Sequence, residues 1–124
     1  MYLHDLEEEL LRLNALQAAQ REDGREDEAI FTRITINVFS ICKTIYGVCR
    51  KTASASEFQI RYLHKLDELA RSWETARTAA ADHGDDCKAA IETIKLEALA
   101  RCRARFISTE TEEQHAGSTG HPAV

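Results

Sequence analysis

Apolar residues recur at helical spacing through the middle of the chain. Between residues 30 and 49 they are separated alternately by three and four positions, at Phe31, Ile34, Val38, Ile41, Ile45 and Val48. This rhythm is typical of a helix that packs against other helices. The composition of the stretch, which is rich in Ile, Val, Thr, Phe and Tyr, favours a strand instead. A strand of this length would be unusually long, and the alternation fails at Ile41 and Cys42, so we predict a helix.

Three more segments show the same helical spacing. Together with the first, they place helices at about residues 3–22, 26–52, 54–82 and 86–107. Gly24 and Gly84 stand between segments, where a residue with left-handed backbone geometry can end a helix. Ser54 and Glu57 match the capping box that opens a helix. Because the connections are short, neighbouring helices are expected to run antiparallel.

These elements predict an all-α fold, a four-helix up-down-up-down antiparallel bundle over residues 1–108. Residues 109–124 are rich in Ser, Thr, Glu and Gly without apolar periodicity, and we predict a disordered C-terminal tail there. In an alternative arrangement the third and fourth helices form one long helix that dimerises. Asp85 follows Gly84 directly and can cap a new helix, which favours the hairpin.

Charge and composition limit the function classes. The 124 residues fit one domain, and the net charge of −5 argues against a surface built mainly for nucleic acid. The acidic start of the chain does not resemble a signal peptide, and no apolar run approaches the roughly 20 residues that span a bilayer. We therefore expect a cytoplasmic protein without a membrane partner.

The predicted topology also sorts the charges along the bundle. The end that holds the second connection gathers arginines and lysines, whereas the opposite end is acidic. The acidic start of the first helix lies at the basic end and partly neutralises it. We interpret both ends as solvated surfaces with ion pairs worth about 0–1 kcal/mol each. Docking of an acidic partner or of nucleic acid at the basic end is the alternative.

The candidate metal ligands are widely spaced. Four cysteines are present, at Cys42, Cys49, Cys87 and Cys102, and none forms a C-x-x-C pair. The only Glu-x-x-His motif, which two-metal bundles require on two helices, lies in the tail at residues 112–115. We expect no metal and no cofactor, with the cysteines as buried thiols. A metal-binding bundle stays an alternative, as does a reactive Cys87 near a helix N-terminus.

One pair of residues suggests catalysis. Arg77 and His83 are separated by five residues, a spacing that resembles the R-x4-6-H motif of HEPN-type ribonucleases. Those proteins are also small helical bundles that dimerise, and the resemblance implies that Arg77 and His83 act on an RNA phosphodiester. No other catalytic set is visible in the sequence, so no catalytic activity is the first expectation.

Three large apolar residues point away from the predicted seam of residues 31–48. They are Ile36, Phe39 and Tyr46. In a monomer some of them would be exposed, and exposed apolar clusters mark interfaces. We therefore predict that the protein acts through protein–protein interaction, as an adaptor or regulator. Its partner would be a second copy of itself, giving a homodimer, or another protein.

Overall fold

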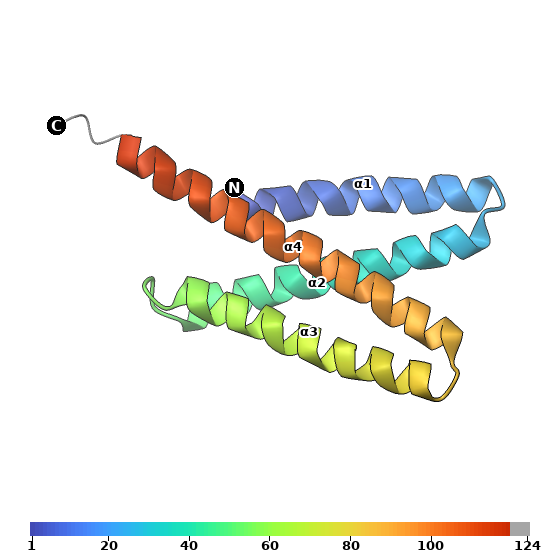
Figure 1. The fold of residues 1–124 in the computed structure, drawn as a ribbon. Helices are drawn as coiled ribbons and strands as arrows, with labels where there is room; N and C mark the ends of the chain where they lie inside the picture. Colours follow the sequence, from blue (N-terminus) through green and yellow to red (C-terminus); the bar gives the residue numbers. More distant parts are fainter. Residues whose placement is uncertain (120–124) are drawn as a thin grey trace.

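The computed structural model is an all-α fold of four helices (Figure 1). The helices are α1 (Tyr2–Glu22), α2 (Glu26–Thr52), α3 (Phe58–Asp82) and α4 (Asp86–Thr119). The structure describes the backbone of residues 1–119 and the side chains of residues 1–110. Successive helices run antiparallel, as the sequence predicts. None of the described helices is both long and apolar enough to cross a membrane.

Two glycine turns create the helical hairpins. Gly24 and Gly84 have φ angles of 75° and 73°, the left-handed region in which glycine is favoured. The backbone N–H of Asp85 donates to the carbonyl of Ala80 at 2.8 Å, and the Asp85 carboxylate accepts the N–H of Lys88 at 3.0 Å. These contacts close α3 and open α4. The alternative of one long helix across Gly84 is therefore wrong.

The start of α3 differs from the predicted capping box. The Ser54 hydroxyl lies 3.2 Å from the Ser56 hydroxyl, and no side chain caps α3, which begins at Phe58. Instead, the Ser54 carbonyl accepts the backbone N–H groups of Glu57 and Phe58 at 3.1 and 3.0 Å. This backbone turn satisfies the Glu57 N–H that the Ser54 hydroxyl of a capping box would have served, and the Ser54 and Glu57 side chains are exposed.

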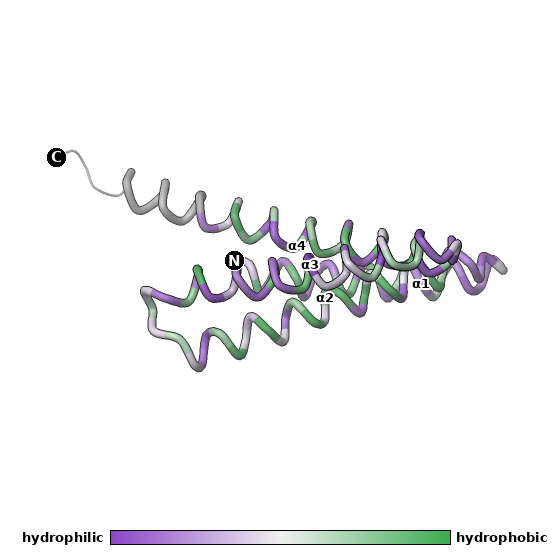
Figure 2. Tube along the Cα trace, turned by 60° about the horizontal axis from the view of Figure 1, so that its bottom comes forward, coloured by the Kyte–Doolittle hydropathy of each residue, from purple (hydrophilic) through white to green (hydrophobic). Residues whose placement is uncertain are grey.

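The helices form two hairpins that meet through α2 and α4. α1 packs on α2, α3 packs on α4, and α2 also contacts both α3 and α4. α1 meets α4 more briefly, and it meets α3 through side chains, with the Tyr2 hydroxyl 2.6 Å from that of Tyr62. Figure 2 shows hydrophobic segments, in green, alternating with hydrophilic ones along the helices. In Figure 1 the two glycine turns lie at the same end, where the hairpins diverge. One side of α2 is left exposed, at Ile30, Ile41 and Val48.

An aromatic cluster joins all four helices at the end opposite the glycine turns. Its members are Tyr2, Tyr46, Phe58, Tyr62 and Phe106. The ring centroids of Tyr62 and Phe106 are 4.8 Å apart, edge to face, and those of Tyr2 and Phe106 are 5.1 Å apart. Such pairs contribute about 0.5–1.5 kcal/mol beyond the burial of their area. This cluster is the aromatic centre of the hydrophobic core.

The interface of α1 and α2 becomes polar near their shared turn. The hydroxyl of Thr32 donates to the Gln20 side-chain oxygen at 2.7 Å, and the Gln17 amide donates to the carbonyl of Ala29 at 3.4 Å. Gln17, Gln20 and Thr32 are buried. Because a buried polar group is costly without a partner, these bonds favour one arrangement of the two helices.

α2 turns a different side to the core than its heptad seam predicts. Ile36 and Phe39 are buried, with 8% and 4% of their surface exposed, and Tyr46 packs in the aromatic cluster. The expectation that these residues point away from the core is therefore wrong. Of the predicted seam, Val38 is buried and Ile34 and Ile45 are half-buried, whereas Phe31, Ile41 and Val48 are exposed. α2 carries two apolar stripes, and its spacing alone does not identify the stripe that is buried.

α4 extends beyond the predicted bundle boundary at residue 108. Its backbone is helical to Thr119. Thr109 is buried and donates to the carbonyl of Arg105 at 2.9 Å, while Gln59 of α3 donates to the Glu110 carboxylate. The contact between Gln59 and Glu110 extends the packing of α3 against α4 past Phe106, the last predicted apolar residue. Residues 120–124 of the predicted tail lie outside the described residues.

Candidate interaction surface

An exposed stripe of branched side chains runs along α2 on the side away from the core. We define the α2 outer face as Ile30, Ile34, Asn37, Ile41, Thr44 and Val48. Ile30 and Val48 are each 53% exposed and Ile41 is 38% exposed, while Ile34 is half-buried. The face exists because residues three or four positions apart on a helix point the same way, and the buried residues Ile36, Phe39 and Cys42 lie on another side of α2.

The α2 outer face carries almost no charge. Between Ile30 and Val48 the charged residues are Arg33, which is exposed beside the face, and Lys43, whose Nζ lies 3.6 Å from the Glu7 carboxylate of α1. Lys43 is therefore directed to α1 and away from the outer face. Charges gather at the ends of the helix, with Glu26, Asp27 and Glu28 in the first turn and Arg50 and Lys51 in the last.

The side chains of this face are suited to binding without large entropy loss. Ile, Val and Thr are branched at Cβ and have few χ1 rotamers, so docking fixes little motion that is not already restricted. At Gly47, next to Val48, an added Cβ would meet no atom within 4 Å, so the space beside the backbone is open. A neighbouring helix could approach closely there.

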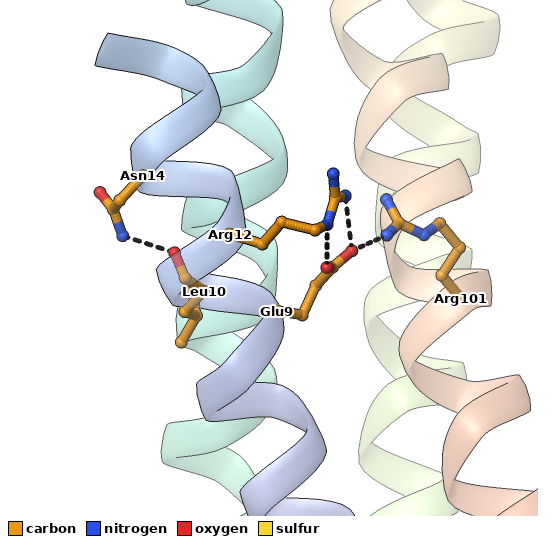
Figure 3. Close-up of polar contacts among 5 residues, drawn as sticks. All are labelled: Glu9, Leu10, Arg12, Asn14 and Arg101. Atoms are coloured by element: carbon orange, nitrogen blue, oxygen red, sulfur yellow. Dashed lines mark hydrogen bonds and ion pairs between the residues drawn. The ribbon is translucent and has the colours of Figure 1, made fainter. Parts of the chain in front are cut away.

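A second surface feature is the groove between α1 and α4. It has a volume of about 730 Å³ and is lined by Leu6 and Phe39 together with charged residues of both helices. Figure 3 shows Glu9 between Arg12 of its own helix and Arg101 of α4. Arg12 Nε lies 2.5 Å from Glu9 Oε1. The Arg101 guanidinium also lies over the Phe39 ring, 5.1 Å from its centroid.

The carboxylates of this groove are held in their charged form. Hydrogen bonds from Arg12 and the nearby Arg101 keep the pKa of Glu9 below its usual range, and a hydrogen bond from Arg105 Nε, 2.7 Å away, does the same for the pKa of Asp5. The acidic start of α1 therefore neutralises the arginines of α4, as the sequence predicts. The ion pairs of Arg101 with Glu9 and of Arg105 with Asp5 cross the groove, so the protein's own side chains bridge α1 and α4 there.

The proposed catalytic pair lies at the end of α3. Arg77 is half-buried and its Nη2 lies 2.5 Å from the Glu74 carboxylate one turn earlier. His83 follows the last residue of α3 and is exposed, with its backbone N–H donating to the carbonyl of Ala79. Over residues 1–110 no hydrogen bond links Arg77 to His83. Arg77 and His83 as a catalytic pair therefore stay a prediction.

The cysteines are distributed over α2 and α4. Cys42, Cys49 and Cys102 are buried and Cys87 is exposed. A hydrogen bond to the Cys42 thiol and burial both raise the pKa of the Cys102 thiol above its usual range. Within the described side chains, no group of three His, Cys, Asp or Glu residues could hold a metal ion. The side chains of the Glu-x-x-His motif at residues 112–115 lie outside the described ones.

Comparison with protein-family models, with curated proteins and with solved structures found no match for this chain. A proposal for the function therefore depends on the surface features of the molecule itself. Ile30, Asn37 and Thr44 of the outer face are not among the interface residues predicted from the sequence. A second heptad series through these positions, three or four residues from Ile34, Ile41 and Val48, is the signal that identifies them.

Proposed function

We propose that this protein acts through protein–protein interaction, as an adaptor or regulator, and that it docks its partner on the α2 outer face. The observation that carries the proposal is the exposure of Ile30, Ile41 and Val48 along one side of one helix. Contiguous exposed apolar surface is costly in water and marks interaction sites. An uncharged stripe of this kind suits a helix from another protein chain.

The dimensions of the face limit the interface to a small one. From Ile30 to Val48 the helix is about 27 Å long and has a circumference of about 35 Å, so one third of its surface there is about 320 Å². A complex would bury roughly 640 Å² in total from this face and its match. Specific stable interfaces bury roughly 1,200–2,000 Å² and crystal contacts mostly less than about 800 Å². We therefore expect reversible association, to which flanking residues such as Phe31 contribute.

The proposed surface differs from the interface predicted from sequence. Ile36, Phe39 and Tyr46 pack inside the bundle, and Phe39 is also covered by Arg101. A partner could reach them only if helices separated. The interaction is therefore assigned to the other apolar stripe of α2, which is already open to solvent.

Paired charge insertions test the proposal. Ile41→Glu places a carboxylate in the middle of the outer face, whereas Ile60→Glu changes an equally large residue that is 74% exposed on α3. Both variants should fold, because neither position is buried. Protein partners recovered from cells, and self-association measured by light scattering, should be lost in Ile41→Glu and retained in Ile60→Glu. Equal behaviour of the two variants in both measurements would contradict the proposal.

A further inference from the structure

The α2 outer face has the heptad geometry of a two-stranded coiled coil. Ile34, Ile41 and Val48 form one series with a spacing of seven, and Ile30, Asn37 and Thr44 form a second series with the same spacing. The two series alternate by three and four positions, as the a and d positions of a coiled coil do. The face therefore presents a complete seam to a second helix, and Ile30, Ile41 and Val48 of this seam are exposed.

In an antiparallel coiled coil, the residues of one series face those of the other series. A two-fold axis at the level of residue 39, the midpoint of α2, brings matching positions together. Ile30 then faces Val48 of a second copy, Ile34 faces Thr44, and Ile41 faces Asn37. Every position of the seam thus meets its counterpart without an offset, and the apolar ends of the seam cover one another.

The same register pairs opposite charges at both ends. One heptad before Ile34 is Asp27, and one heptad after Thr44 is Lys51, so these two residues face each other across the axis. Both are exposed, and neither forms an ion pair within residues 1–110. A parallel arrangement would instead place Asp27 beside Asp27 and Lys51 beside Lys51. Charge therefore favours the antiparallel pairing.

The flanks of the seam also permit a close approach. Arg33, Ser40 and Gly47 lie on one side of it, and the open space at Gly47 leaves room for a neighbouring backbone. Phe31 lies exposed on the other side, where it can cover the joined apolar residues. Because the pattern matches itself, a second copy of the chain satisfies it without any further partner.

On the basis of the proposed function, we infer that the occupant of the α2 outer face is a second copy of this chain. Its α2 helix runs antiparallel to the first, about a two-fold axis at the level of residue 39. The resulting dimer is isologous, so each contact of the seam occurs twice. At each end of the dimer Asp27 meets Lys51. Next to this ion pair Ile30 meets Val48, and Ile34 meets Thr44 closer to the axis.

Site-directed cross-linking tests the orientation. The exposed Cys87 is first replaced by serine, and single cysteines are then introduced by Ile30→Cys and by Val48→Cys. A mixture of the two variants should form an interchain disulfide under diamide, because facing positions approach within the reach of a disulfide. Ile30→Cys alone should not cross-link, since its two copies would lie about 27 Å apart along the helix axis. Self-cross-linking of Ile30→Cys would overturn the antiparallel pairing.

Charge reversal provides an independent measurement. Asp27→Lys and Lys51→Asp should each weaken self-association by about two- to tenfold at low salt, and the double variant should restore it. Reversal of Arg71, an exposed residue of α3, is the matched control and should leave association unchanged. Failure of the double variant to recover association would contradict the register.

The outcomes separate this inference from the proposed function. If the wild type stays monomeric at millimolar concentration but loses a cellular partner in Ile41→Glu, the second copy is the wrong occupant and the interaction surface stands. If it dimerises and Ile41→Glu abolishes dimerisation, the cross-links decide the orientation. If Ile41→Glu changes neither association nor partners, both the surface and its occupant are wrong.

Discussion

The paired hydroxyls of Tyr2 and Tyr62 allow a direct test of how the core is stabilised. Their oxygen atoms lie 2.6 Å apart, and the Tyr62 hydroxyl also donates to the carbonyl of Cys42 at 3.4 Å. Tyr62 is completely buried and Tyr2 is 3% exposed, so water cannot replace a missing partner. If Tyr62 donates to Cys42, then Tyr2 donates to Tyr62, and the loss of each hydroxyl has a different consequence.

We expect Tyr62→Phe to lower the free energy of unfolding by about 1–3 kcal/mol, because it leaves the buried Tyr2 hydroxyl without an acceptor. Tyr2→Phe should cost less, about 0.5–1.5 kcal/mol, because Tyr62 keeps the Cys42 carbonyl. The double variant removes both hydroxyls and leaves no unpaired group. Its cost should therefore fall below the sum of the single costs, by about 1 kcal/mol.

Urea denaturation at pH 7 measures these differences. Helical circular dichroism and the fluorescence of Trp73, the only tryptophan, should report the same transition, which would support a two-state analysis. Low protein concentration keeps self-association from adding to stability. Phe106→Leu, in the same cluster but without a hydroxyl, controls for a general change in packing. Additive costs of the two tyrosine substitutions, or a larger cost for Tyr2→Phe, would refute the reasoning.

Three further outcomes follow from burial and charge. Burial raises the pKa of both Tyr2 and Tyr62 above its usual range, so the folded chain holds their protons more tightly than the unfolded chain. Stability should be intact below about pH 10 and fall above it by up to about 1.4 kcal/mol per pH unit for each. An equally steep fall in the double phenylalanine variant would contradict this. Under native conditions a maleimide should label one thiol, that of Cys87, and unfolding in urea should expose three more to labelling. Mass spectrometry counts the labels, and rapid labelling of Cys102 in the native protein would contradict its burial. The ribonuclease alternative predicts RNA cleavage that His83→Ala abolishes; because Arg77 is paired with Glu74, we expect no cleavage that depends on His83.

The sequence predicts the number, order and direction of the helices because those features depend on local signals. Gly24 and Gly84 end helices through backbone geometry that few other residues adopt, and apolar spacing separates helix from strand even where β-branched residues dominate. α4 is longer than predicted because its extension past Phe106 depends on contacts such as Gln59 with Glu110. Such contacts leave no apolar periodicity in the sequence.

The orientation of α2 could not be predicted from the same signals. Its two stripes have similar spacing, so a periodicity argument cannot choose between Phe39 on one side and Ile41 on the other. The choice depends on the fit of Phe39 and Tyr46 among α1, α3 and α4, which is a property of the assembled bundle. For the same reason, the candidate interaction surface becomes visible only once the buried stripe is known.

The buried bond between Thr32 and Gln20 bears on how the chain avoids misfolding. During folding, α2 can collapse onto α1 with either stripe, because both are apolar enough to exclude water. If α2 were rotated so that its other apolar stripe faced α1, the Thr32 side chain would turn away from α1. The Gln20 side chain would then lose its hydrogen-bond partner, at a cost of about 1–3 kcal/mol if Gln20 stayed buried. This polar contact therefore selects the native state against a competing collapsed state, even though it adds little to the net stability of the native one. The Thr32 hydroxyl thus acts together with the fit of Phe39 and Tyr46 to hold α2, which is apolar on two sides, in a single rotation.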